Sequence, residues 1–352
     1  MEKFIVAELN MTGAEHLSFN TCILEKLHKK NKIRKIYCSA LHYQYFPNTL
    51  KKIPMDNVKV IDGKSRRFFS KLCIEIYNVF RILLRPHKKY LFLSVFPPVL
   101  CLLAFLNIIF RKRITVFLHG ELNGLRELNN NITSYAFWVK LYFKSGLYKY
   151  IENIVVGEHI KKGISEVHYI NPDELKYINH PIVPMFSNKE KDIDCASIGY
   201  ANGKAYDELF ESISKLDKPF IHIGMVSNVL YEKYKSSCIK FHAMPGNALS
   251  YDRYLSLISR TKYGIFMYAH DYSFTTSGAM LDAMSNNTVI LTIANTFAAY
   301  LDSIDYPVLS FDSSEKLFEQ IDNLPDYDDL LKKHNPIIAR KRFSELSSDW
   351  VL

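Results

Sequence analysis

Short apolar runs of strand length alternate with helical stretches along the whole chain, and this alternation constrains the fold more than any other feature. The first run, Phe4–Leu9, precedes a helical stretch at 14–30. Further strands are expected at Lys35–Ala40, Val58–Ile61, Tyr90–Val95, Ile114–Leu118 and Asn153–Val156. A second series is expected at Cys195–Ile198, Phe220–Ile223, Ile239–His242, Tyr263–Met267, Val289–Thr292 and Val308–Phe311. Such alternation predicts an α/β fold with parallel sheets covered on both faces.

The two series predict two Rossmann-like domains facing each other across a cleft. At 352 residues the chain exceeds the usual length of one domain. The segment 176–192 is polar and contains prolines, so it is interpreted as a linker. The expected domains are then 1–175 and 193–335, with a closing charged helix at 336–352.

One segment is apolar enough to imitate a transmembrane span. It runs from Leu91 to Phe110, but Pro97-Pro98 divides it into a piece of strand length and a piece of helix length. A buried strand that feeds a buried helix is the ordinary unit of a doubly wound sheet. We therefore expect a soluble chain. The polar residues that soon follow the N-terminal strand argue against a signal peptide.

The six cysteines are scattered, without a CxxC pair or a Cys/His cluster at metal-ligand spacing. This pattern predicts reduced thiols in a cytoplasmic protein and no zinc site. The net charge of +9 is uneven, because basic residues crowd between Lys64 and Arg113 among aromatic ones. Such a face suits an anionic membrane surface. A solvated lysine-rich face is the simpler alternative, and nucleic acid is disfavoured because no binding module accompanies the charge.

The stretch Thr276-Ser277-Gly278 indicates a small-residue turn that opens a helix. A Ser-Gly pair there lets backbone N–H groups approach an anion, and the helix dipole adds favourable potential. Asp282 follows one turn later and is placed to bond a sugar hydroxyl. A diphosphate linked to a ribose fits this pair of features. An ordinary helix start is the alternative.

Three more loops follow predicted strands and are expected at the same kind of sheet edge. The first contains Gly13, Glu15 and His16, and the second places His119 and Glu121 on either side of a glycine. The third runs from Gly199 through Tyr200 to Lys204.

Together these loops resemble the GT-B glycosyltransferases, particularly the large retaining family of bacterial polysaccharide and lipopolysaccharide enzymes. The Gly13 loop resembles that family's N-terminal glycine loop, and His119-Gly120 its strand-end histidine motif. Gly199 with Lys204 resembles the opening of its nucleotide-binding domain, and the loop at 242–247, with Met244, its base-contacting loop. The family commonly has two glutamates around the diphosphate helix. Here Asp282 stands at the second position and Phe274 at the first.

The resemblance implies a divergent, cytoplasmic transferase of the hexosyltransferase type, peripheral on the inner face of the cytoplasmic membrane. It would move a sugar from a nucleoside diphosphate to a lipid-linked or growing surface polysaccharide acceptor, such as O-antigen or capsule. It also implies a C-terminal helix that returns to the N-terminal domain. Two other classes stay open: a sugar-nucleotide epimerase and a noncatalytic partner in a polysaccharide assembly complex.

No acidic pair of the DxD type stands in a convincing context, so the chain is expected to use no metal or other cofactor. Backbone N–H groups, Ser277 and Lys204 would then stabilise the departing diphosphate. If configuration inverts, Glu121 is the candidate general base. If it is retained, no dedicated base is needed and His119 would contact the donor sugar.

Overall fold

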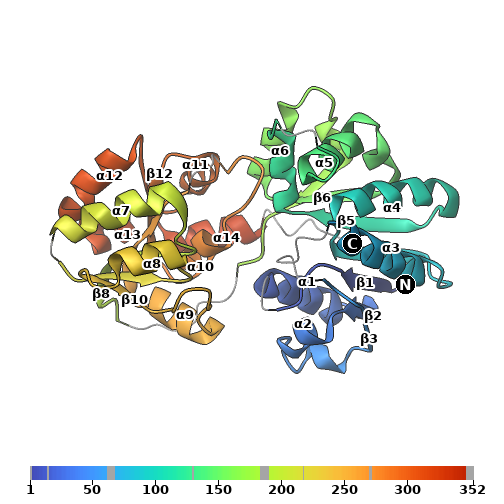
Figure 1. Ribbon diagram of the computed structural model, residues 1–352, viewed down its shortest axis with the longest axis horizontal. Coiled ribbons are helices and arrows are strands. Elements are labelled where there is room, and N and C mark those ends of the chain that lie inside the picture. Colours follow the sequence, from blue (N-terminus) through green and yellow to red (C-terminus); the bar gives the residue numbers. More distant parts are fainter. Residues whose placement is uncertain are drawn as a thin grey trace. The chain divides into compact units, whose positions relative to one another are not determined.

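The structure is a computed structural model that describes residues 2–13, 16–61, 68–128, 131–182, 190–216, 218–268 and 272–345. These residues form two compact units (Figure 1). The first contains the described residues up to Pro181 together with Phe274–Thr276, and the second contains the remainder. Each unit is described by itself below.

The first unit is built on a parallel sheet of order β3-β2-β1-β4-β5-β6-β7. Its strands are β1 Phe4–Glu8, β2 Ile33–Cys38, β3 Met55–Asn57, β4 Lys89–Ser94, β5 Arg113–Leu118, β6 Glu152–Val156 and β7 Leu175–Ile178. Its helices are α1 Leu17–Lys29, α2 Ala40–Gln44, α3 Phe68–Leu83, α4 Pro97–Phe110, α5 Tyr135–Lys144 and α6 Glu158–Ser165. Short 3-10 helices occur at η1 Leu50–Lys52, η2 Gly120–Leu125, η3 Leu147–Tyr150 and η4 Pro172–Glu174.

Both faces of this sheet are apolar because helices cover both. Alternate strand residues such as Phe92 and Val116 pack with α3, α4, α5 and α6. Their neighbours Leu91 and Phe117 pack on the other face with α1. The run Leu91–Phe110 is divided as predicted, since α4 begins at Pro97. No described helix is long and apolar enough to cross a membrane.

The second unit repeats the plan with a parallel sheet of order β10-β9-β8-β11-β12-β13. Its strands are β8 Ile193–Ile198, β9 Phe220–Ile223, β10 Ile239–Phe241, β11 Thr261–Phe266, β12 Val289–Ile293 and β13 Val308–Phe311. Its helices are α7 Gly203–Leu216, α8 Asn228–Tyr234, α9 Tyr251–Ile258, α10 Gly278–Ser285, α11 Thr296–Ser303, α12 Ser314–Gln320, α13 Tyr327–Lys333 and α14 Pro336–Glu345, with η5 at Ile321–Asn323. The predicted α/β architecture with two Rossmann-like domains is thus confirmed.

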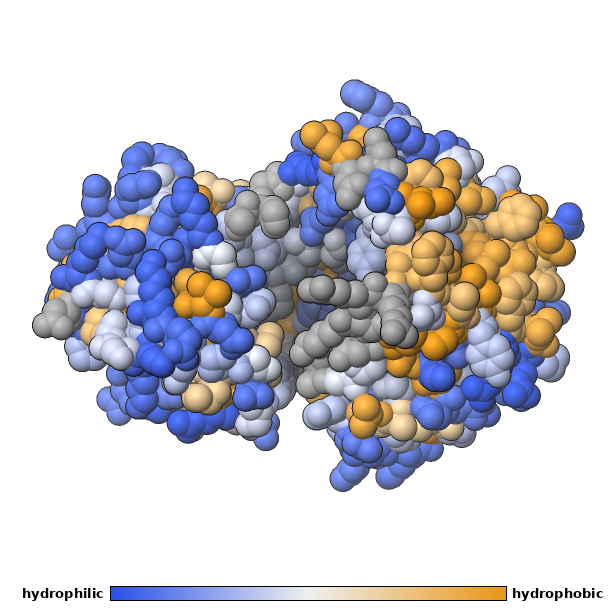
Figure 2. Space-filling view, in the orientation of Figure 1, coloured by the Kyte–Doolittle hydropathy of each residue, from blue (hydrophilic) through white to orange (hydrophobic). Residues whose placement is uncertain are grey.

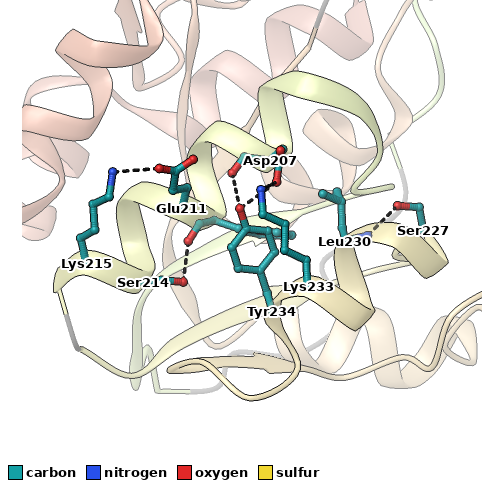
Figure 3. Close-up of polar contacts among 9 residues, drawn as sticks. Asp207, Glu211, Ser214, Lys215, Ser227, Leu230, Lys233 and Tyr234 are labelled. Carbon is teal, nitrogen blue, oxygen red and sulfur yellow. Dashed lines mark hydrogen bonds and ion pairs between the residues drawn. The ribbon is translucent and has the colours of Figure 1, made fainter.

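Polar contacts hold α7 and α8 together on one face of the second sheet (Figure 3). The Tyr234 hydroxyl on α8 donates to Oδ1 of Asp207 on α7 at 2.7 Å, and Lys233 Nζ lies 2.7 Å from the same oxygen. The Ser227 hydroxyl caps α8 by accepting from the Leu230 N–H at 3.4 Å. The end of α8 is therefore held against α7.

Two expected segment boundaries differ from the structure. The third strand lies at Met55–Asn57 rather than Val58–Ile61, because these residues pair with β2, with Met55 opposite Ile36. β7 takes residues 176–178 of the expected linker, and only Leu175 and Ile178 of this short strand are buried. α14 packs in the second unit through Ala339 and Phe343. The residues that would continue this helix to the first domain, from 346 on, lie outside the described ones.

Candidate functional site

The carboxyl end of β8 lies beside the first turn of α10 in the second unit. β8 pairs with β11 on one side and β9 on the other, so the order of strands reverses here. A Cβ atom on Gly199 would lie 3.9 Å from the Cβ of Ala279 in the first turn of α10. Ligands of doubly wound sheets bind at such a reversal. The structure therefore brings together two loops that lie far apart in the sequence.

The glycine turn after β8 requires two glycines in contact. Gly199 has a φ of 112°, which side-chain-bearing residues rarely adopt. A Cβ atom on Gly224, which follows β9, would lie 1.9 Å from the Gly199 carbonyl oxygen. The backbones of the two turns thus approach each other more closely than any side chain would allow.

α10 begins with the exposed backbone that an anion site needs. The Ser277 hydroxyl, buried, accepts from the Met280 N–H at 3.2 Å and also hydrogen-bonds the Tyr268 hydroxyl. Gly278 is exposed, and a Cβ atom there would meet nothing within 4 Å. The first N–H groups of a helix lack intrahelical partners and carry partial positive charge. This end of α10 can therefore receive a phosphate.

Asp282 lies one turn into α10 and is largely buried. The Tyr251 hydroxyl donates to its Oδ1 at 3.4 Å. Burial raises the pKa of Asp282 to about 7, against the lowering effect of that hydrogen bond. Near neutral pH the carboxyl group can therefore act as a hydrogen-bond acceptor or, once protonated, as a donor.

The remaining predicted residues of this unit are exposed. Tyr200 is 53% exposed and Met244 is 59% exposed, and the sulfur of Met244 accepts from the Tyr231 hydroxyl at 3.5 Å. The Lys204 side chain is 89% exposed, and its Nζ pairs with Oε1 of Glu208 at 3.4 Å. An exposed ion pair of this kind contributes little stability, so Lys204 can exchange Glu208 for another anion.

In the first unit, a buried network anchors the loop that contains Gly13. Glu8, at the end of β1, accepts from the Asn10 N–H at 2.9 Å and from the Asn20 amide at 3.1 Å. The Asn20 amide also lies 3.0 Å from His42 Nε2, and His42 Nδ1–H donates to the Gly13 carbonyl at 2.6 Å. Glu8 was not among the predicted residues. Its place at a strand end, just before a glycine loop, was the available signal.

Three histidines of the first unit gather around Phe19. The ring of His119 lies 4.8 Å from that of His16 and 4.6 Å from that of Phe19, and His180 lies 5.1 Å from Phe19. His119 Nε2–H donates to the Leu93 carbonyl at 2.9 Å, so its Nδ1 carries the lone pair. Burial, reinforced by His16 and His180, holds the pKa of His119 well below its usual range. His119 is therefore a neutral hydrogen-bond acceptor.

Two buried carboxyl groups lie near the same lysine in the first unit. Glu121 Oε1 and Glu75 Oε2 have no hydrogen-bond partner among the described residues. Burial raises the pKa of Glu121 to about 7 and that of Glu75 to about 8, while Lys71 lowers both. The Phe96 N–H donates to Glu75 Oε1 at 2.7 Å. Glu75 was not predicted, because its position on the basic helix α3 suggested a solvated residue.

The segment Phe274–Thr276 packs within the first unit. Phe274 is buried, and the Arg126 guanidinium lies 4.8 Å from its ring centre. The Thr276 hydroxyl donates to the Val156 carbonyl at 2.5 Å, and His159 Nε2–H donates to the Thr275 carbonyl at 3.0 Å. Thr276, predicted to bind the donor, thus uses its hydroxyl to hold this segment.

Glu15 lies outside the described residues. Among the residues that the structure describes, no group of three or more His, Cys, Asp or Glu side chains is arranged to hold a metal ion. The second unit thus contains two glycine turns and a helix start, and the first unit contains a glycine loop and buried titratable groups.

No family model and no curated protein sequence matches the chain. Solved structures do match it. HepE from Anabaena, crystallised with UDP, is 11% identical with a TM-score of 0.65, over 98% of this chain and 95% of HepE. A glycosyltransferase from Rickettsia africae is 14% identical with a TM-score of 0.61, over 99% of this chain and 95% of its own.

The lipopolysaccharide outer core galactosyltransferase WaaB, in its apo form, is 9% identical with a TM-score of 0.59, over 98% of each chain. At these identities the likeness concerns the fold. The chain therefore has the GT-B fold that the sequence predicted.

Proposed function

We propose that the chain is a glycosyltransferase that moves a hexose from a nucleoside-diphosphate sugar to a lipid-linked or growing surface polysaccharide acceptor. The observation that carries the proposal is the contact between the Gly199 turn and the start of α10, where the strand order reverses. The structural neighbour HepE was crystallised with UDP and with UDP-glucose, and WaaB is described as a galactosyltransferase of the lipopolysaccharide outer core. A nucleotide-sugar donor is consistent with both observations.

The departing diphosphate would be stabilised without a metal. Ser277 caps α10 and Gly278 begins it, and the first N–H groups of a helix lack intrahelical partners, so they would offer preorganised donors. Lys204 would release Glu208 and add positive charge, and Asp282 would bond a hydroxyl of the nucleoside or the sugar. The exposed side chains of Tyr200 and Met244 are the ones we assign to the nucleotide base.

On the first unit, Glu121 is the general base that we propose for an inverting reaction. A pKa of about 7 suits proton transfer near neutral pH, and a bound acceptor hydroxyl would satisfy the unpartnered Oε1. If configuration is retained, His119 with its free Nδ1 lone pair would contact the donor sugar instead. The Gly13 loop, with Glu15 and His16, would contact the acceptor.

A membrane-associated acceptor is supported by the surface of the first unit. Figure 2 shows apolar side chains gathered over α3 and α4. On α3, Phe69 is 67% exposed and Tyr77 is 63% exposed, and on α4 Ile109 is 67% exposed. Aromatic and apolar side chains mixed with basic ones suit the interface of an anionic bilayer. We therefore place the protein on the inner face of the cytoplasmic membrane, as a peripheral protein.

A noncatalytic role in a polysaccharide assembly complex is the second candidate. It is favoured by Phe274, which occupies a position where a glutamate is common and is buried against Arg126. A panel of UDP-sugars distinguishes the two roles. Release of UDP from one of them supports the transferase, and the absence of release from every donor, with UDP still bound, supports the partner.

Gly278→Ala is the direct test of the donor site. The added methyl group meets nothing within the protein, so the fold should be unchanged. It would however occupy the space that a phosphate needs, and the loss of one charge-assisted hydrogen bond costs roughly 1.5–3 kcal/mol. Calorimetry with UDP should therefore show at least a tenfold loss of affinity.

Ser314→Ala is the matched control, because Ser314 is also the first residue of a helix capped by a serine. It should bind UDP as the wild type does. Equal UDP affinity in Gly278→Ala and the wild type would refute the assignment.

A further inference from the structure

An open basic pocket lies at the amino ends of β4, β5 and β6 in the first unit. Its volume is about 500 Å³. The loops that carry the candidate site follow the carboxyl ends of the strands, so the pocket is at the opposite edge of this sheet. Five basic side chains line it, from Lys89, Lys112, Arg113, Lys149 and Lys176. Its two acidic ones are Glu152 and Glu174.

Both carboxylates of the pocket are already engaged. Glu152 pairs with Lys176 and accepts from the Thr115 hydroxyl at 2.6 Å. Glu174 Oε1 lies 3.2 Å from Lys149 Nζ. The acidic groups therefore neutralise two of the five cations. The other three have no carboxylate partner among the described residues, although Lys89 Nζ lies 4.0 Å from the centre of the Phe4 ring.

Lys89 and Arg113 are the most closely associated of these charges. They are partners in register on β4 and β5, so their side chains leave the same face of the sheet. Neither pairs with a carboxylate in the part of the chain that the structure describes. Burial, Arg113 and Lys32 lower the pKa of Lys89, and Glu152 and Glu2 offset part of this effect, so the pKa remains below its usual value. A bound anion would relieve the repulsion between Lys89 and Arg113, and an arginine fork matches the geometry of a phosphate.

Hydrogen bonds fix the position of Lys112, which lines the edge of the pocket. The Asn107 side chain accepts from the Lys112 N–H at 2.8 Å and donates to the Tyr150 carbonyl at 2.7 Å, which joins the end of α4 to η3. Lys112 Nζ donates to the Leu83 carbonyl, to the Arg85 carbonyl at 3.0 Å and to the Tyr90 hydroxyl at 3.1 Å. The positions of Lys112 and Tyr150 are thus fixed before any ligand binds.

Apolar side chains flank the charged pocket. Tyr150, which lines it, is 50% exposed. Phe110 is 36% exposed, and its ring centre lies 5.9 Å from Lys112 Nζ. Leu84, next to the carbonyls that Lys112 contacts, is 70% exposed. Free phosphate would make no contact with these apolar side chains. A lipid offers both an anionic headgroup for the basic residues and an apolar region for the apolar side chains.

We propose that this pocket binds the phosphate of an anionic lipid headgroup while its apolar rim enters the membrane interface. The proposal rests on the membrane association proposed above and assigns its specific contact to the amino edge of the first sheet. Lys89 and Arg113 hold the phosphate, and Lys112 adds charge from the rim.

The test compares two charge-matched variants of the full chain. Lys89→Gln/Arg113→Gln removes two of the three cations of the pocket that have no carboxylate partner among the described residues. Lys51→Gln/Lys52→Gln removes two exposed lysines of η1 that do not line it. Binding is measured by sedimentation with vesicles of equimolar phosphatidylglycerol and phosphatidylcholine, and with phosphatidylcholine alone. Since each basic residue near an anionic surface contributes about 1 kcal/mol, the pocket variant should bind about thirtyfold more weakly.

The control variant should lose much less, and binding by the wild type should weaken with added salt. Equal losses of vesicle affinity in both variants would show that only net charge matters. That result would overturn the assignment of the lipid site to this pocket. Loss of inorganic phosphate affinity in the pocket variant, with vesicle binding unchanged, would overturn the lipid assignment.

The charge-conserving variant Lys89→Arg/Arg113→Lys should keep vesicle binding, which excludes misfolding as the cause of a loss. UDP affinity, measured on the same samples, reports on the donor site separately. If the wild type did not bind UDP, the proposed function would be contradicted. The vesicle measurements would still test the pocket, because they do not depend on UDP.

Discussion

Replacing Glu121 by glutamine should change the pH dependence of folding in a direction that the structure specifies. Glu121 Oε1 is buried and unpartnered, and burial raises the pKa of the side chain from 4.5 to about 7. The folded chain therefore binds this proton more tightly than the unfolded chain does. The stability that protonation contributes is complete below 4.5 and is lost as the pH rises through about 7.

The size of this loss follows from the two pKa values. A rise from 4.5 to about 7 corresponds to roughly 3 kcal/mol once the carboxyl group is ionised in both states. Glutamine has the same shape and cannot ionise. The Glu121→Gln variant should therefore be more stable than the wild type by about 2–3 kcal/mol near pH 8.5, and the difference should nearly vanish near pH 5.

Urea denaturation of both proteins at the two pH values measures the difference. Trp138 in α5 reports on the first unit. Glu166→Gln, at an exposed residue that follows α6, is the control and should show no such pH-dependent difference. A difference between Glu121→Gln and the wild type that is equal at both pH values would refute the reasoning.

The same variant tests the role in catalysis. A general base contributes on the order of 10²–10⁴-fold in rate, so Glu121→Gln should lower kcat by that much and leave UDP affinity intact. The wild-type rate should rise with pH through about 7. A product with retained configuration, or near-normal turnover by the variant, would remove Glu121 from the mechanism.

Three further predictions follow from other parts of the molecule. Gly224→Ala should unfold the second unit or destabilise it by more than about 3 kcal/mol in urea titrations, because its Cβ atom would overlap the Gly199 carbonyl; wild-type stability would contradict the described turn. Ser277→Ala combined with Lys204→Ala should weaken nucleotide-sugar binding by roughly 1.5–3 kcal/mol for each lost contact, and unchanged affinity in calorimetry would exclude both residues from the donor site. Cys73 should react first with a maleimide, since it is the exposed cysteine; labelling of Cys38 at the same rate, despite a pKa that burial raises to about 12, would contradict its burial.

The alternation of strands and helices could be predicted because its signals are local. β9 and β13 occur at the predicted residues, and the proline pair separates β4 from α4 as expected. β3 was misplaced and β7 was not predicted, because both are short strands at the edges of the sheet. Their positions depend on pairing with β2 and β6, which the sequence does not show directly.

Parts of the candidate site could likewise be predicted from local sequence, and other parts could not. Ser277 caps α10 and Gly278 begins it, as the residue types there predict. Lys204 was predicted as a phosphate ligand from the resemblance of its loop to the glycosyltransferase family, and its pairing with Glu208 follows from the helix α7. The network of Glu8, Asn20 and His42 joins residues from three elements, and no short motif indicates it.

The sequence by itself determined the α/β architecture, the helix start at Ser277 and the excess of positive charge in the first unit. Each depends on residues within a few positions of one another or on composition. The tertiary structure decided which turns touch, as Gly199 does with Gly224, and which like charges become neighbours, as Lys89 and Arg113 do. It also decided that Glu121 and Asp282 titrate near pH 7. Proximity and loss of solvent arise only when distant segments pack together, and these two effects set the chemistry of the site.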